Sequence, residues 1–324
     1  MNNSAAISTE GLVRHFGSVR AVDGVDLRVP RGEIFGFLGP NGAGKTTVIR
    51  MLITLLAPTA GTIMVAGYDA VRDPKEVRLR IGVALQEAAL DAKQTGRELL
   101  RLQGKLYGLS RKQANRRIAD LSDLVDIGEA MGRLIGTYSG GMKRRLDLAA
   151  ALVHNPEVLF LDEPTSGLDP ISRARIWKEV HKINRELGVT IFLTTQYLEE
   201  ADVLADHVGI IDGGKVAISG TPRELKRAQG SDMIIAKLES NISLAVEILE
   251  DMDVIRRVEA HGHELLLSVD NGAALLSTVA LALNQRGINV QELTLRTPTL
   301  DDVFLQVTGT RLEDRAGDQP YSTD

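Results

Sequence analysis

The most informative segment of this sequence is Gly39-Pro40-Asn41-Gly42-Ala43-Gly44-Lys45-Thr46. It fits the phosphate-binding loop pattern G-x-x-x-x-G-K-[ST] without a gap. The apolar run before it, Ile34–Leu38, is typical of a short buried strand, and Thr47–Leu56 after it predicts a helix. Strand, loop and helix in this order are the context that the pattern needs, so a glycine-rich turn that matches by chance is the weaker interpretation.

The chemistry of this loop follows from its residue types. Its glycines let backbone N–H groups close around phosphate oxygens, and the start of the following helix adds a partial positive charge. Lys45 can reach the β- and γ-phosphates of a nucleotide, and the Thr46 hydroxyl can ligate Mg²⁺. We therefore assign residues 39–46 and the adjacent Thr47 to nucleotide binding.

Composition narrows the class of protein. The chain has 324 residues, enough for two domains with real cores. Its net charge of −5 argues against a general nucleic-acid binder, and the absence of cysteine excludes disulfides and thiolate zinc sites. The N-terminal residues lack a secretory pattern, and the longest apolar runs are too short to span a membrane. We expect a soluble protein whose membrane role, if any, needs a partner.

Two acids end a second apolar run. Val158–Leu161 is followed directly by Asp162 and Glu163. Carboxylates at the end of a buried strand are costly unless a metal or a reaction uses them. Beside a phosphate loop, Asp162 is a candidate to hold Mg²⁺ through water, and Glu163 is a candidate to polarise the water that attacks the γ-phosphate.

Two further motifs lie at the ends of predicted elements. Gln86 ends the strand Ile81–Leu85; its amide oxygen could ligate a metal or a water, but alone it means little. Ser139-Gly140-Gly141 precedes a helical pattern that runs to Val153, so Ser139 is a good N-cap and the helix start suits an anion. A plain helix start is the alternative, but it leaves the costly pair of glycines unexplained.

The chain divides by pattern into two domains and a tail. Residues 93–153 are helical and charged and interrupt the α/β pattern, as an inserted helical subdomain would. Residues 230–308 have the order β-α-β-β-α-β of a small ferredoxin-like α+β domain. Within it, His261 and His263 could suggest a metal, but solvated histidines on a turn are the better interpretation. Residues 309–324 are polar, and we expect them to be disordered.

Together these motifs resemble the ATPase subunit of an ATP-binding cassette (ABC) transporter. The similarity covers about residues 7–229 and rests on five motifs in the order of the family: the phosphate loop, Gln86, Ser139-Gly140-Gly141, Asp162 with Glu163, and the turn Ser166–Asp169. One phosphate loop would be weak evidence, whereas five motifs in register are very specific. The implied fold is an α/β P-loop NTPase domain of the ABC type with a helical subdomain, followed by the small α+β domain.

The resemblance implies a two-chain mechanism that uses ATP and Mg²⁺. Two copies would pack head to tail, with each ATP between the phosphate loop of one chain and Ser139, Gly140 and Gly141 of the other. Phe16, which by position alone is better explained as a packing aromatic, would stack on adenine. Gln86 would ligate Mg²⁺ together with Thr46 and Asp162 and would sense a membrane partner, and Asp169 would contact the opposing chain.

Two departures from the family pattern matter. Met142 directly follows Ser139-Gly140-Gly141, the signature segment, at a position where the family usually has glutamine, a change of small chemical cost. Gln196 stands where the family has a histidine that contacts the γ-phosphate. An amide can donate a hydrogen bond but cannot carry a proton, so Glu163 is left as the general base and the hydrolysis rate is in question.

The residues around Gln196 also narrow the resemblance to one branch. Thr194–Ala201, Thr137–Met142 and Thr297–Leu305 are similar to the daunorubicin-resistance branch of bacterial exporters. That branch implies a separate membrane permease, export of a hydrophobic antibiotic, drug or lipid, and a place on the cytoplasmic face of the plasma membrane. One alternative is a soluble ABC ATPase acting on nucleic acid or ribosomes, which the single cassette and the negative charge disfavour. Another is a regulatory ATP-binding protein that hardly hydrolyses, which Gln196 makes conceivable.

Overall fold

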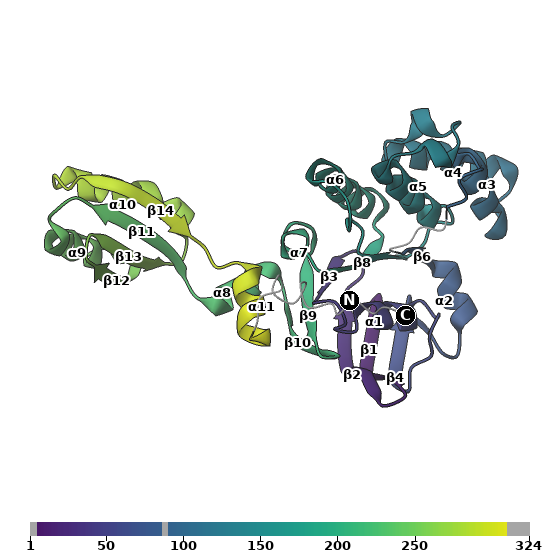
Figure 1. The fold of residues 1–324 in the computed structure, drawn as a ribbon, viewed down its shortest axis with the longest axis horizontal. Helices are drawn as coiled ribbons and strands as arrows, with labels where there is room; N and C mark the ends of the chain where they lie inside the picture. Colours follow the sequence, from purple (N-terminus) through teal and green to yellow (C-terminus); the bar gives the residue numbers. More distant parts are fainter. Residues whose placement is uncertain (1–4, 86–89, 310–324) are drawn as a thin grey trace, which may run out of the picture. The chain divides into compact units, whose positions relative to one another are not determined.

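The computed structural model describes residues 5–85 and 90–309. The chain forms two compact units (Figure 1). The first unit contains the residues up to Pro222 and those from Val307 onward, and the second unit is Arg223–Gln306. Each unit has its own hydrophobic core. Within the described residues, none of the helices has the length and apolar character that a membrane span requires.

The centre of the first unit is a six-stranded sheet in the order β10-β9-β3-β8-β7-β6. Its strands are β3 (Ile34–Leu38), β6 (Ile81–Ala84), β7 (Val158–Asp162), β8 (Thr190–Thr195), β9 (His207–Asp212) and β10 (Lys215–Gly220). All neighbours pair in parallel except β9 and β10, which form an antiparallel hairpin. Every residue of β3, β7 and β8 is buried, as expected for parallel strands covered on both faces. The carboxyl ends of β3, β7 and β8 therefore meet at one edge, where open α/β sheets bind ligands.

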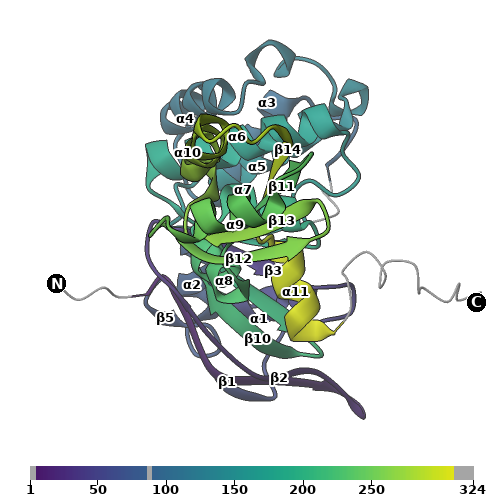
Figure 2. The ribbon, with the colours of Figure 1, turned by 90° about the vertical axis from the view of Figure 1, so that its left-hand side faces the viewer.

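A second, antiparallel sheet covers one side of the first helix. It has the order β2-β1-β4-β5, with β1 (Ile7–Phe16), β2 (Val19–Val29), β4 (Ala60–Val65) and β5 (Tyr68–Asp69). Figure 2 shows β1 and β2 side by side along their length. Helix α1 (Lys45–Leu52) packs between the two sheets, because Val48 and Ile49 share one core with residues of β1, β3 and β8.

The prediction of a helix over Thr47–Leu56 is wrong at both ends. Helix α1 begins earlier, at Lys45, because the phosphate loop leads straight into its first turn. It ends at Leu52, because Thr54 adopts a left-handed φ of 65° and the N–H groups of Leu55 and Leu56 both turn back to the carbonyl of Arg50.

A helical subdomain interrupts the strands, as the sequence predicted. It consists of α3 (Gly96–Leu106), α4 (Arg111–Leu124), the short 3₁₀ turns Gly128–Ala130 and Ile135–Thr137, and α5 (Gly140–Leu152), grouped together in Figure 1. Ser110 and Gln113 form a capping box at the start of α4. The remaining helices of the first unit are α2 (Pro74–Arg80), α6 (Pro170–Leu187) and α7 (Leu198–Leu204).

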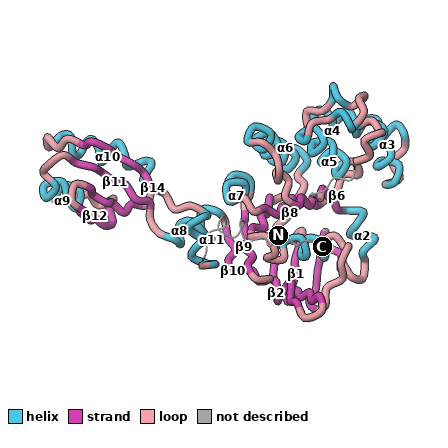
Figure 3. The backbone as a smooth tube through the Cα atoms, viewed as in Figure 1, coloured by secondary structure: helices cyan, strands magenta, loops and turns pink. Residues whose placement is uncertain are grey.

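The second unit has the predicted ferredoxin-like order. After α8 (Pro222–Gln229), which joins the two units in sequence, come β11 (Asp232–Leu238), α9 (Ile242–Glu250), β12 (Ile255–His261), β13 (Glu264–Val269), α10 (Gly272–Gln285), β14 (Val290–Arg296) and α11 (Leu300–Thr308). The strands pair in antiparallel fashion in the order β12-β13-β11-β14. Helices α9 and α10, cyan in Figure 3, share one apolar core with this sheet. Apart from Gly309, the predicted tail 309–324 lies outside the described residues.

Candidate functional site

The glycine-rich loop connects β3 to α1 and requires its glycines. Gly42 and Gly44 have φ values of 79° and 106°, which side chains rarely permit. A Cβ atom on Gly44 would also lie 2.6 Å from the carbonyl oxygen of Ala21. A Cβ atom on Gly39 would overlap the carbonyl oxygen of Ile211. The conformation of this loop therefore requires glycine at these three positions.

Lys45 lies at the floor of the loop and is 4% exposed. Its ammonium donates to the carbonyl oxygens of Gly39 at 2.6 Å and Pro40 at 3.0 Å, and Nζ lies 3.7 Å from Oε1 of Glu163. Burial lowers the pKa of Lys45, while the negative charges of Glu163 and Asp162 act in the opposite direction. The predicted cation and the predicted base therefore face each other at one end of the sheet.

Both acids at the end of β7 are held by Thr194 of the neighbouring strand β8. The Thr194 hydroxyl donates to Oδ1 of Asp162 at 2.5 Å. The backbone N–H of Glu163 lies 3.1 Å from both the carbonyl oxygen and the hydroxyl of Thr194. Glu163 has a left-handed φ of 45°, a conformation that costs a non-glycine residue about 1–3 kcal/mol and persists only when its surroundings enforce it.

All three predicted catalytic residues line one pocket of about 380 Å³. It is lined by Ala21, Pro40, Asn41, Gly42, Gly44, Lys45, Thr46, Thr47, Glu163, Ser166 and Gln196. Three strand ends thus contribute: the loop after β3, the acid after β7 and the amide after β8. Lys45, Glu163 and Gln196, far apart in the sequence, line the same pocket.

The other predicted residues lie elsewhere on the first unit. Phe16 ends β1, is 46% exposed and has the Arg14 guanidinium 4.7 Å from its ring centroid. Ser139 caps α5 and accepts the N–H of Met142 at 3.3 Å. Asp169 caps α6, and hydrogen bonds from Ser172 lower the pKa of its carboxyl. Ser139, Gly140 and Asp169 are exposed, and none of these residues lines the pocket. The predicted ligand Gln86 lies outside the described residues.

Sequence reasoning missed three residues that build the site. Ser166 lines the pocket, although the sequence argument used it only as part of a turn. Thr194 lies opposite Asp162 in the β7–β8 pairing. Arg144 is buried on the first turns of α5. One signal was present for Arg144: Leu148 and Leu152 follow it at i+4 and i+8 and are buried on the same helix face.

The donor set suits a magnesium ion. Thr46 offers a hydroxyl in the pocket. Asp162 is a buried carboxylate whose negative charge acts on Lys45, another residue of the pocket. Among the described residues no group of three or more His, Cys, Asp or Glu side chains could hold a metal. Mg²⁺ prefers oxygen ligands and typically completes its shell with water and substrate phosphates, so few protein ligands are needed here.

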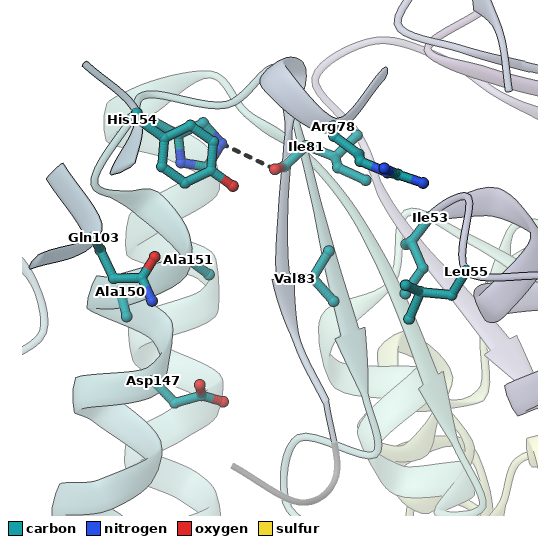
Figure 4. Close-up of a pocket in the computed structure, with 11 residues that line it drawn as sticks. Ile53, Leu55, Arg78, Ile81, Val83, Gln103, Asp147, Ala150, Ala151 and His154 are labelled. Atoms are coloured by element: carbon teal, nitrogen blue, oxygen red, sulfur yellow. Dashed lines mark hydrogen bonds between the residues drawn. The ribbon is translucent and has the colours of Figure 1, made fainter. Parts of the chain in front are cut away.

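A second cavity of about 330 Å³ lies between the helical subdomain and the central sheet. In Figure 4, Asp147 and His154 lie on one side of Val83, and Ile53, Leu55 and Arg78 lie on the other. The His154 ring stacks on Tyr107 with centroids 3.7 Å apart, and its Nε2 lies 2.9 Å from the Ile81 carbonyl oxygen. Burial raises the pKa of Asp147 to about 6, although Arg144 opposes the shift.

The phosphate loop follows β3, and the two acids follow β7, which is two strands away in the sheet. Together with the inserted helical subdomain, this arrangement defines a P-loop nucleotide hydrolase. The comparisons with known proteins make this class narrower. Residues 22–166 match the family model "ABC transporter", and residues 220–308 match "ATP-binding protein DrrA1-3-like, C-terminal domain".

Relatives of known name cover almost the whole chain. The daunorubicin resistance ATP-binding protein DrrA3 of Streptomyces coeruleorubidus is 46% identical over 94% of this chain and 96% of its own. The daunorubicin/doxorubicin resistance ATP-binding protein DrrA of Streptomyces peucetius is 44% identical over 97% and 96%. A solved ATP-binding subunit of an ABC transporter matches with a TM-score of 0.62 at 28% identity, covering 69% of this chain and 92% of that one. The chain belongs to the family of ABC transporter ATP-binding subunits, which bind nucleotide and hydrolyse ATP to drive transport.

Proposed function

We propose that this protein energises the export of a hydrophobic compound, an antibiotic, another drug or a lipid, through a separate membrane permease. The proposed ATPase activity is supported by one observation: Lys45, Glu163 and Gln196 line the same pocket. The export part rests on the relatives, whose names assign them to daunorubicin and doxorubicin resistance.

In the proposed reaction, Glu163 is the general base. Its carboxylate stands on the pocket wall 3.7 Å from the Lys45 ammonium and takes the proton of the attacking water. Lys45 exchanges the carbonyls of Gly39 and Pro40 for phosphate oxygens and stabilises the charge that develops there. Gln196 donates an amide hydrogen bond to the γ-phosphate. Thr46, Asp162 and the predicted ligand Gln86 would hold Mg²⁺, which would supply positive charge to neutralise the phosphates.

The second half of each ATP site comes from a second copy of the chain. Ser139 and Asp169 are exposed at the starts of α5 and α6, and each accepts hydrogen bonds from its own helix. A helix N-terminus offered to solvent is suited to a phosphate group brought by another molecule. In the head-to-tail pair, Ser139, Gly140 and Gly141 bind the γ-phosphate held by the partner copy, Asp169 contacts that copy, and Phe16 stacks on the adenine of its own site.

The membrane permease docks at the cavity that Tyr107 and His154 line, on the cytoplasmic face of the plasma membrane. Large apolar side chains are exposed on the elements around this cavity: Leu55, Leu79, Leu102 and Leu106. Exposed apolar groups gathered beside a groove are typical of protein–protein contacts. A helical loop of the permease, with apolar side chains for this rim, is the occupant that the groove fits.

The test is a trap that uses Glu163→Gln in the full-length chain. We expect ATP turnover to fall by about 10²-fold or more, because general-base catalysis contributes about that much, while ATP binding persists. Loaded with ATP in its native host and extracted gently from membranes, the variant should co-purify with a polytopic membrane protein in near-equal amount. The drug sensitivity of cells lacking that membrane protein then identifies the class of compound exported.

Two results would overturn parts of this proposal. Undiminished turnover in Glu163→Gln would remove Glu163 as the base. Recovery of a homodimer without a membrane protein, or with ribosomes or nucleic acid, would remove the exporter function and leave the ATPase.

A further inference from the structure

Arg144 makes a buried set of contacts that the reaction described above does not use. It stands on α5 and is 8% exposed. Its Nε donates to the carbonyl oxygen of Pro164 at 3.0 Å, and its Nη2 donates to the carbonyl oxygen of Asp162 at 3.2 Å. These two carbonyls belong to the residues on either side of Glu163. The Arg144 guanidinium therefore hydrogen-bonds to the backbone immediately before and immediately after the proposed base.

The backbone at this point needs to be held. Glu163 has a φ of 45°, and a strained conformation of this kind persists only where the surroundings over-determine it. Thr194 fixes the N–H of Glu163 from the β8 side. Arg144 fixes the flanking carbonyls from the helical subdomain, with the rigid planar fork that only arginine offers. Together they determine the direction in which the Glu163 carboxylate leaves the strand.

The remaining donors of Arg144 tie this segment to two other places. Its Nη1 donates to the carbonyl oxygen of Leu85 at 2.7 Å and to Oδ2 of Asp147 at 3.2 Å. Leu85 directly precedes Gln86 in the chain, and Asp147 lines the second cavity. Helix α5 itself begins directly after Ser139. Arg144 thus connects α5, which begins at the signature segment, by hydrogen bonds to the segment that contains the proposed general base Glu163 of the same chain.

We propose that Arg144 is a positioning residue for hydrolysis, which holds the peptide units around Glu163 so that its carboxylate faces the attacking water. The proposal rests on the assignment of Glu163 as the general base. It assigns to Arg144 an effect on the rate of the chemical step and none on ATP binding, because its contacts reach the Glu163 segment and not the phosphate loop.

The neighbouring Arg145 provides a matched control on the same helix. Its guanidinium donates to the carbonyl oxygen of Asp126 and lies 3.8 Å from Glu179, away from the Glu163 segment. Arg144→Gln and Arg145→Gln remove the same charge one residue apart. If only the charge or the stability of α5 mattered, the two substitutions would act alike.

The experiment measures kcat and KM for ATP, with melting temperatures, on full-length Arg144→Gln, Arg144→Lys and Arg145→Gln. We expect Arg144→Gln to lower kcat by about tenfold or more, equivalent to about 1.4 kcal/mol of barrier, with KM changed by less than about twofold. Arg145→Gln should keep kcat within about twofold. Arg144→Lys keeps the charge but not the fork, so its kcat should fall between the two.

A second variant covers the case in which Arg144→Gln does not fold. Arg144→Gln leaves the half-buried Asp147 without its partner, and Arg144→Gln combined with Asp147→Asn removes both charges and keeps the pocket filled. This double variant should show the same fall in kcat. We also expect Arg144→Gln to add less than about a twofold loss in a Glu163→Gln background, because the group it positions is already gone.

Each outcome decides between the hypotheses. Normal kcat in the folded Arg144 variants, or full activity in Arg144→Lys, overturns the positioning function. Equal losses in Arg144→Gln and Arg145→Gln assign the effect to helix stability and overturn it as well. Normal turnover in Glu163→Gln overturns the base assignment itself, whereas an inactive Glu163→Gln with a normal Arg144→Gln overturns the inference about Arg144 alone.

Discussion

At the carboxyl edge of the central sheet, Lys45 and Glu163 are packed into one pocket and already face each other at 3.7 Å. At the starts of α5 and α6, Ser139 and Asp169 are exposed and hydrogen-bonded only within their own helical turns in the contacts that the described residues provide. The first region is a site assembled by one chain. The second is a pair of helix starts that are folded but face solvent.

The contrast between these two regions indicates which part of the proposed ATP site depends on a second molecule. The residues of the pocket are fixed by strand pairing and by Thr194, so a single copy positions them. The signature residues are fixed only as helix caps, which orients their N–H groups but brings them no ligand. We therefore expect a single chain to bind ATP by itself and to hydrolyse it only when another copy supplies the signature segment.

The largest effect that this comparison predicts is rescue between inactive variants. Lys45→Ala damages the pocket, and Ser139→Glu places a carboxylate where the γ-phosphate should bind; each alone should lose about 10²-fold or more of ATP turnover. In a head-to-tail pair made of one copy of each, one site has both defects and the other has none. An equal mixture should therefore recover about a quarter of normal turnover, since about half of the pairs are mixed and each has one intact site.

The control for this rescue pairs two defects of the same pocket. Mixing Lys45→Ala with Glu163→Gln gives a damaged pocket at both sites of every pair, so turnover should stay near background. Recovery in this control would show that the sites do not divide as proposed. Absence of recovery when Lys45→Ala is mixed with folded Ser139→Glu would show that Ser139 does not act across the interface.

A smaller effect concerns Gln196, the residue of the pocket that departs from the family pattern. Its amide lines the pocket beside Glu163, and a histidine there can donate a similar hydrogen bond. We expect Gln196→His to keep kcat within about threefold or to raise it, because Glu163 remains as the base. Gln196→Ala, which removes the donor, is the matched control and should lose more.

The opposite result would be informative about the pocket. A loss of more than about tenfold in Gln196→His, roughly 1.4 kcal/mol of barrier, would mean that the site is built specifically for an amide. The pocket would then depend on Gln196, a departure from the family pattern that has no equivalent in the signature segment.

Much of the pocket could be predicted because its chemistry demands particular residue types at particular spacings. A phosphate loop needs Lys45 after a glycine-rich turn, and a buried strand rarely ends in Asp162 and Glu163 without a use for them. The α+β unit could be predicted from its order of elements alone, since hydrophobic periodicity and local caps such as Thr299 with Asp302 are readable in sequence. These are local signals.

What could not be predicted depends on contacts between distant segments. Thr194 holds Asp162 only because β8 pairs with β7, and the sequence does not state the strand order. Arg144 and Arg145 are adjacent and chemically identical, yet one faces the Glu163 segment and the other faces Glu179. The end of α1 was misplaced because the turn at Thr54 has a left-handed conformation without a glycine to announce it.

The smallest predicted effect tests what holds the exposed helix starts in place. Glu179 of α6 lies 3.8 Å from Arg145 of α5, and it is 8% exposed. Burial raises the pKa of Glu179 from 4.5 to about 7, although Arg145 opposes the shift. Because the folded pKa lies above the ordinary value, this carboxyl favours the folded state when protonated, and that contribution is lost as the pH rises from about 4.5 to 7.

Glu179→Gln, which cannot ionise, should therefore be more stable than the unmodified chain at pH 8 and equal to it near pH 4.5. We expect a rise in melting temperature of about 2–4 °C at pH 8, corresponding to about 1 kcal/mol, with Glu186→Gln on the exposed face of the same helix as the control. A fall in melting temperature at pH 8 would mean that the Arg145–Glu179 ion pair holds α5 to α6. A rise would mean that apolar packing holds the two helices together and that the helix starts at Ser139 and Asp169 are kept in place without help from that charge pair.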